Sequence, residues 1–322
     1  MDSNNDEVAF YLPNFIWIYK DGSVERLART EIIPTSALDP QTGVSSKDVL
    51  IAPKNGVSTW LFLPKIITNS SPQKLPLLVY YHGGSFCFET PFSPIYNRYV
   101  SSLVAKANVV VVSVHFRRAP EDPLPIAYNE SWEVLQWVIS HSKGNGLEAW
   151  LNENADLSRI TMIGDSAELQ SLLISHGYLH SSTASKTDST DPTPTPEAKS
   201  HTDFSSTTNA SSGRGSGWGR GGCSHGGHGH SGLTCVNLEK LASKRVLVCV
   251  AEKDGLKERG LFYHKMLGKT GWGGELELME VEREGYVFHL FNPTSKKVVA
   301  MMMMSHLVSF LNQDRTPELL SY

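Results

Sequence analysis

The stretch that decides the fold is Arg159-Ile160-Thr161-Met162-Ile163-Gly164-Asp165-Ser166-Ala167. Its first five residues have the length and apolar character of a short strand. Small and polar residues follow at once, which predicts a sharp turn that leaves the Ser166 hydroxyl exposed at the end of a sheet. Helix capping alone could also explain Asp165 and Ser166, because Asp and Ser are common at helix starts.

A pair of glycines follows another apolar run upstream. His82-Gly83-Gly84-Ser85-Phe86 comes directly after 75–81. Glycines after a strand let backbone N–H groups turn toward a bound oxyanion without interference from a Cβ atom. Alone, two adjacent glycines are more often a simple turn. Together with Ser166 they favour a nucleophilic serine whose oxyanion is held by the N–H groups of Gly83, Gly84 and Ala167.

Two later segments could complete such a site. Asp254 follows the apolar run 245–251, at the place where the orienting acid of a Ser-His-Asp triad lies, although Asp254-Gly255 is also a common turn. A basic residue should come after it, because nucleophile, acid and histidine follow one another in this order in one large class of hydrolases. In the loop 282–291 the only histidine is His289.

Apolar runs of strand length alternate with stretches of helical spacing, both before and after the polar segment 181–234. This alternation predicts a mostly parallel sheet covered by helices. Met301 to Met304 fall in the last expected helix, where they are more plausible as core residues than as metal ligands. The expected strands are 58–64, 75–81, 108–114, 159–163, 245–251 and 275–281, and the expected helices are 129–139, 256–267 and 298–311.

Composition narrows the class of protein. The chain has 322 residues and a formal net charge of −4, which gives no reason to expect a nucleic-acid partner. No apolar run approaches the roughly 20 residues that span a bilayer. The acidic, polar start resembles no targeting peptide, so we expect a cytoplasmic protein without a membrane partner, in which the cysteines are reduced thiols. These are Cys87, Cys223, Cys235 and Cys249.

Several stretches, spread between residues 15 and 293, resemble one family. They are Phe15 to Leu27, His82 to Phe86, His115 to Pro125, Gly164 to Ala167, Val246 to Asp254 and Val287 to Pro293. In these stretches the chain is similar to plant carboxylesterases of the hormone-sensitive-lipase-like α/β-hydrolase family, which includes the 2-hydroxyisoflavanone dehydratases and gibberellin receptors.

The resemblance implies a single α/β-hydrolase domain over 1–322. Its mostly parallel central sheet would carry helices on both faces, and 10–33 would form an N-terminal cap. The resemblance also implies that Ser166 is the nucleophile of a carboxylic-ester hydrolase and Asp254 its acid, with the N–H groups of Gly83, Gly84 and Ala167 as the oxyanion hole. The substrate would be a small-molecule ester, and neither a cofactor nor a metal is expected.

The chain departs from the family pattern in three places. Glu168 stands where the family has the last glycine of Gly-Asp-Ser-Ala-Gly. Tyr286 stands at the place of the catalytic histidine, and tyrosine, with an ordinary pKa near 10, is a poor general base at neutral pH. The nearest imidazole is that of His289, which accompanies the catalytic histidine in relatives. The third departure, 181–234, is rich in Ser, Thr, Gly and Pro, and we expect it to be disordered.

These departures leave alternatives open. One is a non-catalytic small-molecule binding protein of the gibberellin-receptor type, in which the triad histidine is also absent. Another is a non-functional product of a coding sequence shifted in frame over about 168–234, since one restored base would return the expected glycine. The cysteines and histidines within 223–235 could in principle bind zinc, but their spacing matches no closed site.

Overall fold

The computed structural model describes residues 7–65, 74–166, 244–291 and 298–313, all of which belong to one compact unit of the chain. The predicted low-complexity segment 181–234 and the possible metal ligands within it lie outside these residues, as do Ala167 and Glu168.

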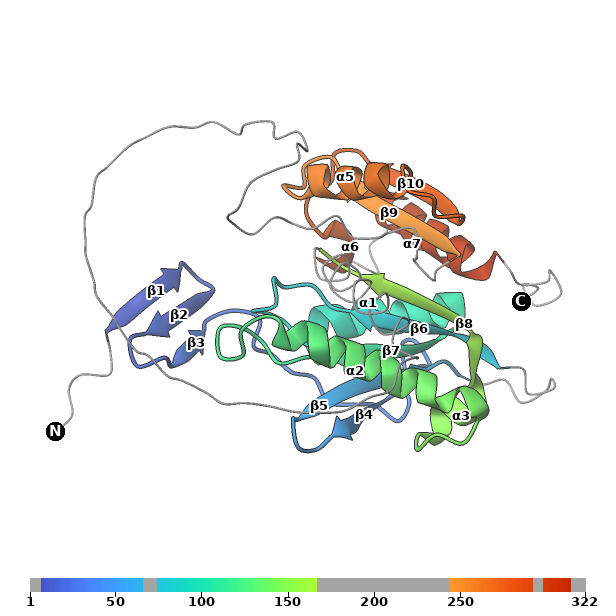
Figure 1. Cartoon of the computed structure of the whole chain (residues 1–322), viewed down its shortest axis with the longest axis horizontal. Helices are drawn as coiled ribbons and strands as arrows, with labels where there is room; N and C mark the ends of the chain where they lie inside the picture. The colour runs from blue at the N-terminus through green and yellow to red at the C-terminus, as the bar shows by residue number, and fades with distance from the viewer. Residues whose placement is uncertain (1–6, 66–73, 167–243, 292–297, 314–322) are drawn as a thin grey trace, which may run out of the picture. The chain divides into compact units, whose positions relative to one another are not determined.

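The larger sheet has five strands in the order β4-β5-β7-β6-β8 (Figure 1). The strand β6 lies parallel to β7 and to β8, whereas β5 pairs antiparallel with β4 and with β7. Val79 in β6 is opposite Val112 in β7 and Met162 in β8. The strands are β4 (Ser45–Ala52), β5 (Val57–Leu63), β6 (Leu75–Tyr81), β7 (Val110–His115) and β8 (Ala155–Gly164).

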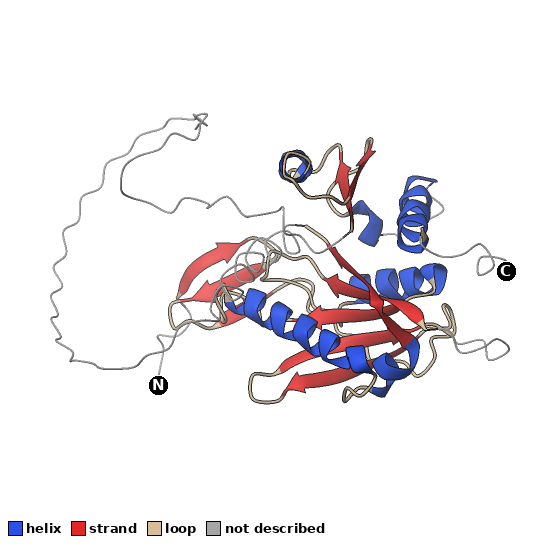
Figure 2. Cartoon of the chain, turned by 45° about the vertical axis from the view of Figure 1, so that its right-hand side comes forward, coloured by secondary structure: helices blue, strands red, loops and turns tan. Residues whose placement is uncertain are grey.

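Alternate side chains of β6 enter two separate hydrophobic clusters, because successive residues of a strand point to opposite faces. Leu77 and Val79 pack with residues of α2 and α3, whereas Leu78 and Tyr80 pack with residues of α1, α6 and α7. Helices therefore cover both faces of the sheet, as predicted (Figures 1 and 2). The helices are α1 (Pro94–Ala107), α2 (Ile126–Ser140), α3 (Ala149–Asn154), α5 (Lys257–Leu267), α6 (Phe288–Phe291) and α7 (Val298–Asn312), with a 3-10 turn at His141–Lys143.

Two smaller sheets complete the described structure. The strands β9 (Arg245–Ala251) and β10 (Glu275–Val281) pair in parallel, residue for residue. Near the N-terminus, an antiparallel sheet of β1 (Val8–Leu12), β2 (Ile16–Tyr19) and β3 (Val24–Arg26) occupies much of the region expected to be the cap. No helix in the described ranges is long and apolar enough to cross a membrane.

The strands expected from the sequence are present, and the bounds of β6, β9 and β10 agree residue for residue with the prediction. The last helix runs over the four methionines, but only half of them lie in the core. Met303 and Met304 are buried, whereas Met301 and Met302 are more than half exposed. The strands β1 to β4 and the helices α1, α3 and α6 were not predicted.

Candidate active site

Ser166 lies in the turn that follows β8, as the sequence predicts. Its φ is 64°, a left-handed conformation that is uncommon for a residue with a side chain. Asp165, the preceding residue, donates its backbone N–H to the Tyr81 carbonyl oxygen at 3.3 Å, which ties the turn to the end of β6. The serine is thereby held at the carboxyl end of the sheet in a strained turn.

The predicted oxyanion loop, His82 to Phe86, lies against this turn. A Cβ atom built on Gly83 would be 3.3 Å from the Ser166 Cβ atom and 3.3 Å from the Asp165 carbonyl oxygen. Gly84 has a φ of +123°, and a Cβ atom there would come within 2.3 Å of the Phe88 carbonyl oxygen. Gly84 therefore needs glycine, whereas a Cβ atom at Gly83 would be in tight contact with the serine turn. The Gly83 N–H donates to the Tyr96 hydroxyl oxygen at 2.9 Å, a contact that the sequence did not indicate.

Two side chains anchor the oxyanion loop on its other side. The His82 ring stacks on Phe116 with ring centroids 4.4 Å apart, and burial lowers the pKa of His82 to about 3. Arg26, at the end of β3, donates from Nε to the Cys87 carbonyl oxygen at 2.8 Å. Its guanidinium also donates to the Ala119 carbonyl oxygen at 3.0 Å and to both carboxylate oxygens of Glu121. The N-terminal sheet thus holds the loop in place.

Asp254 follows β9, at the predicted place for a triad acid. Its Oδ1 accepts the Leu256 N–H at 2.8 Å, which is the turn contact that the sequence offered as the alternative. The Asp254 loop is bonded to the loop after β10, since the Lys253 N–H donates to the Glu284 carbonyl oxygen at 2.9 Å. These contacts hold Asp254 and the segment that leads to Tyr286 together.

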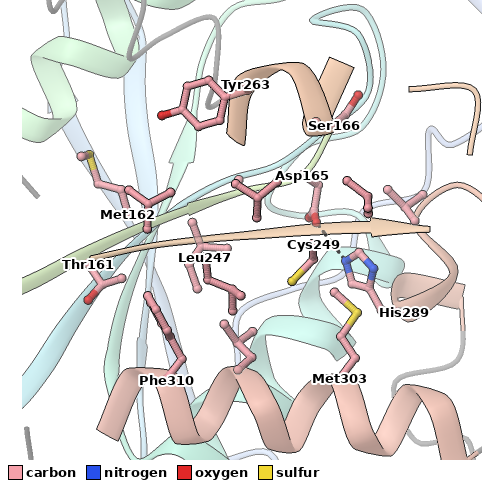
Figure 3. A pocket seen from close by; sticks show the side chains of 18 of the residues that line it. Thr161, Met162, Asp165, Ser166, Leu247, Cys249, Tyr263, His289, Met303 and Phe310 are labelled. Atoms are coloured by element: carbon pink, nitrogen blue, oxygen red, sulfur yellow. Dashed lines mark hydrogen bonds and ion pairs between the residues drawn. The ribbon is translucent and has the colours of Figure 1, made fainter. Parts of the chain in front are cut away.

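His289 lies on α6 and its ring faces Asp165 (Figure 3), whereas the Asp254 side chain bonds the Leu256 N–H of its own turn. Its Nε2 is 2.9 Å from Asp165 Oδ1, and both residues are buried. The other carboxylate oxygen of Asp165 accepts the Tyr80 hydroxyl. Tyr99 meets the His289 ring edge-on, with centroids 5.0 Å apart. Burial, with Asp165 nearby, raises the pKa of Tyr80 and Tyr99 well above the ordinary value. No local pattern indicates this cluster, because 124 positions separate Asp165 from His289.

A cavity of about 540 Å³ brings the predicted residues together. Its lining includes Ser166, Asp254, Tyr286 and His289, and most of the remainder is apolar and comes from β8, β9 and α7. The thiol of Cys249 also faces this space, where burial, and secondarily Asp165, raises its pKa to about 12. In Figure 3 the Ser166 hydroxyl points away from His289. A volume of this size is typical of small-molecule sites.

The described residues offer no evident metal centre. Within 7–65, 74–166, 244–291 and 298–313, no three His, Cys, Asp or Glu side chains are grouped so that they could hold a metal ion.

Comparison with known proteins identifies the family. A family model described as the alpha/beta hydrolase fold matches residues 78–167. The chain is 37% identical to probable carboxylesterase 4, mitochondrial, of Arabidopsis thaliana, over 96% of this chain and 84% of that protein. It is 33% identical to the 2-hydroxyisoflavanone dehydratase of Glycyrrhiza echinata, over 96% and 98%. It is 36% identical to the chloroplastic tuliposide A-converting enzyme 2 of Tulipa gesneriana, over 96% and 80%.

Solved structures share the fold at lower identity. The esterase of Pyrobaculum calidifontis superposes with a TM-score of 0.53 at 16% identity, covering 83% of this chain and 84% of that one. The carboxylesterase EstE1, cloned from a metagenomic library, gives a TM-score of 0.54 at 17% identity, covering 85% and 90%. The predicted α/β-hydrolase fold, with its mixed, mostly parallel sheet, is confirmed, and the chain belongs to the plant carboxylesterase family of α/β hydrolases.

Proposed function

We propose that this protein is a carboxylic-ester hydrolase that uses Ser166 as its nucleophile. The observation that carries the proposal is the left-handed turn at Ser166, which lies against Gly83 and opens on the cavity. The carboxylesterases among its relatives support the same class of reaction. The non-catalytic alternative of the gibberellin-receptor type has no support among these relatives.

The reaction would proceed by acyl transfer. The Ser166 oxygen attacks the ester carbonyl carbon and gives up its proton to a base, and the carbonyl oxygen becomes an oxyanion. Backbone N–H groups at Gly83, Gly84 and Ala167 would stabilise this charge, with the Gly83 N–H leaving its contact to Tyr96. The alcohol departs with a proton, and water then hydrolyses the acyl-serine to a carboxylic acid. Asp254 would orient the base.

The general base is the group that this site supplies least effectively. Tyr286 lines the cavity at the place that the family pattern gives to the histidine, and a neutral phenol is a poor proton acceptor at neutral pH. Nucleophile positioning and oxyanion stabilisation can still accelerate a reaction about 10³-fold to 10⁴-fold over water without a complete triad. We therefore propose slow turnover by the chain as it stands.

The cavity favours one kind of substrate. Its lining is mostly apolar and includes two carboxylates, those of Asp165 and Asp254. Burial of an uncharged, apolar acyl group is favourable there, whereas an anionic group would meet like charges. The proposed substrates are therefore neutral small-molecule esters, hydrolysed without a cofactor.

The test is ester hydrolysis by the purified full-length chain, with p-nitrophenyl butyrate as substrate at pH 7.5. Restoring an imidazole with Tyr286→His should raise kcat/KM by about 10²-fold to 10⁴-fold, the usual contribution of a positioned general base. Ser166→Ala should abolish the reaction in both backgrounds.

Tyr263→His is the matched control, because Tyr263 lines the same cavity. It adds an imidazole away from the family position and should give no such increase. The proposal fails if the parent chain and the Tyr286→His variant both lack esterase activity and Ser166 reacts with a fluorophosphonate in neither protein.

The cytoplasmic location and the absence of membrane and nucleic-acid partners are part of the same proposal. A fluorescent fusion of the full chain, imaged in plant cells beside mitochondrial and plastid markers, tests the location. Accumulation in either organelle would contradict it.

A further inference from the structure

We infer that His289 is a positioning residue that acts through Asp165: their contact sets the position of residue 286 relative to Ser166. The inference rests on the proposed function, because it concerns the geometry of the same site. The two ends of the contact adjoin the two halves of the site. Asp165 directly precedes Ser166 in the turn after β8, and His289 follows Tyr286 by three residues in the segment after β10.

The carboxylate of Asp165 is held at both oxygens. One accepts from His289 Nε2 at 2.9 Å, and the other accepts from the Tyr80 hydroxyl. Tyr80 belongs to β6, so the sheet core fixes Asp165, and Asp165 in turn fixes the imidazole. A hydrogen bond to an ionised acceptor is stronger than one between neutral groups, and burial keeps water from competing for it.

The imidazole is wrongly placed to serve as the base itself. A carboxylate only accepts hydrogen bonds, so the ring nitrogen that faces it, Nε2, carries a hydrogen. The other nitrogen, Nδ1, is buried and has no hydrogen-bond partner among the described residues. The Ser166 hydroxyl points away from this ring in Figure 3. His289 is thus oriented as a donor to Asp165.

The position of His289 is transmitted to residue 286 along the backbone. The Leu290 N–H donates to the Val287 carbonyl oxygen at 3.0 Å, and the Phe288 N–H donates to that of Gly285 at 3.4 Å. These bonds keep 285–290 together as one short unit. Because α6 has only four residues, contacts made by its side chains decide where this unit lies.

The experiment compares His289→Leu, which removes the donor, with His289→Gln, whose amide nitrogen can replace Nε2. His306→Leu is the matched control, since His306 also pairs with a carboxylate, Glu277 Oε2 at 3.4 Å, but at an exposed position. Hydrogen–deuterium exchange is measured on the full-length chain over 155–166 and 282–291. Hydrolysis of p-nitrophenyl butyrate is measured in the Tyr286→His background.

His289→Leu should speed exchange in both segments together, and His289→Gln should leave both close to the parent. In the Tyr286→His background, His289→Leu should lower kcat by about 10²-fold with little change in KM, the usual cost of misplacing a catalytic group by about 1 Å. His289→Gln should restore most of this loss, and His306→Leu should change neither readout.

Two results would overturn the inference: faster exchange confined to 282–291, or loss of activity in His289→Gln as complete as in His289→Leu, which would make His289 the base. Coupled exchange in a chain without any ester hydrolysis would support the link between the two segments and overturn the proposed function instead.

Discussion

The strands that lead to the two halves of the candidate site differ in how completely they are buried. In β6, six of seven residues are buried, whereas in β9 only the last two are. The strand β6 has a hydrogen-bonded neighbour on each side, β7 and β8. Among the described strands, β9 has only β10 as a neighbour. The β6 side carries Gly83 and leads through β8 to Ser166, and the β9 side leads to Asp254 and Tyr286.

The difference shows what a sequence pattern can and cannot predict. Both strands have seven residues, which are apolar except for Arg245 at the start of β9, and both were predicted with correct bounds. Burial on both faces also depends on which segments flank and cover a strand, and this information is not contained in the strand itself. The cavity lies between β8 and β9, where side chains of both strands line the same space.

The largest effect expected from the comparison of β6 with β9 is slow alkylation of Cys249, which lies on β9. Its thiol is exposed to the cavity, and its raised pKa of about 12 keeps it protonated at ordinary pH. With Cys87, Cys223 and Cys235 replaced by Ser, alkylation by iodoacetamide at pH 8 should be about 10³-fold slower than that of an ordinary thiol.

The same protein in urea is the control, because unfolding returns the thiol to water. Mass spectrometry of the alkylated chain gives both rates. Equal rates in the native protein and in urea would mean that Cys249 faces bulk solvent, and the cavity would then not be the apolar space described here.

A matched pair of leucines tests the packing difference directly. Leu78, in β6, is only 1% exposed, and Leu78→Ala should lower the free energy of unfolding by about 2–5 kcal/mol through lost burial and a residual cavity. Leu247, in β9, is only partly buried, so Leu247→Ala should cost less than about 2 kcal/mol. Urea titrations followed by tryptophan fluorescence measure both. Equal losses of unfolding free energy in the two variants would show that the sheets of β6 and β9 do not differ in packing.

The smallest expected effect is acid sensitivity of the five-stranded sheet. Burial, and secondarily Arg118, lowers the pKa of His115 to about 4, whereas an unfolded histidine titrates near 6.5. Below pH 6.5 the unfolded chain therefore binds a proton that the folded chain does not, and stability falls as the pH falls. Between pH 7 and pH 5 this single group should cost about 2 kcal/mol.

His115→Asn should remove that part of the pH dependence, while its amide can still meet the Ser58 hydroxyl, which lies 3.0 Å from His115 Nδ1. Urea titrations at pH 7 and pH 5 give the difference for each protein. If the parent and the variant lose the same stability over this range, His115 does not titrate as proposed.

The sequence predicted much of the fold because strands and helices repeat local patterns. It missed β4, in which Lys47 and Asp48 interrupt the apolar alternation, and α1, whose apolar residues are mixed with polar ones. Within the site, the glycine turn and the serine turn have local signals, so they could be placed. The Asp165–His289 and Gly83–Tyr96 contacts join side chains from different elements, and no spacing in the chain indicates them.

Through Arg26, the N-terminal sheet helps to hold the oxyanion loop in its conformation. A chain that is shortened past β3, or clipped there by a protease, would leave the Cys87 and Ala119 carbonyl oxygens and the Glu121 carboxylate without their cationic donor. Trimming this small sheet for crystallisation would therefore alter a loop more than 60 residues away in sequence. Hybrids that exchange N-termini between relatives need to transfer Arg26 and Glu121 as a pair.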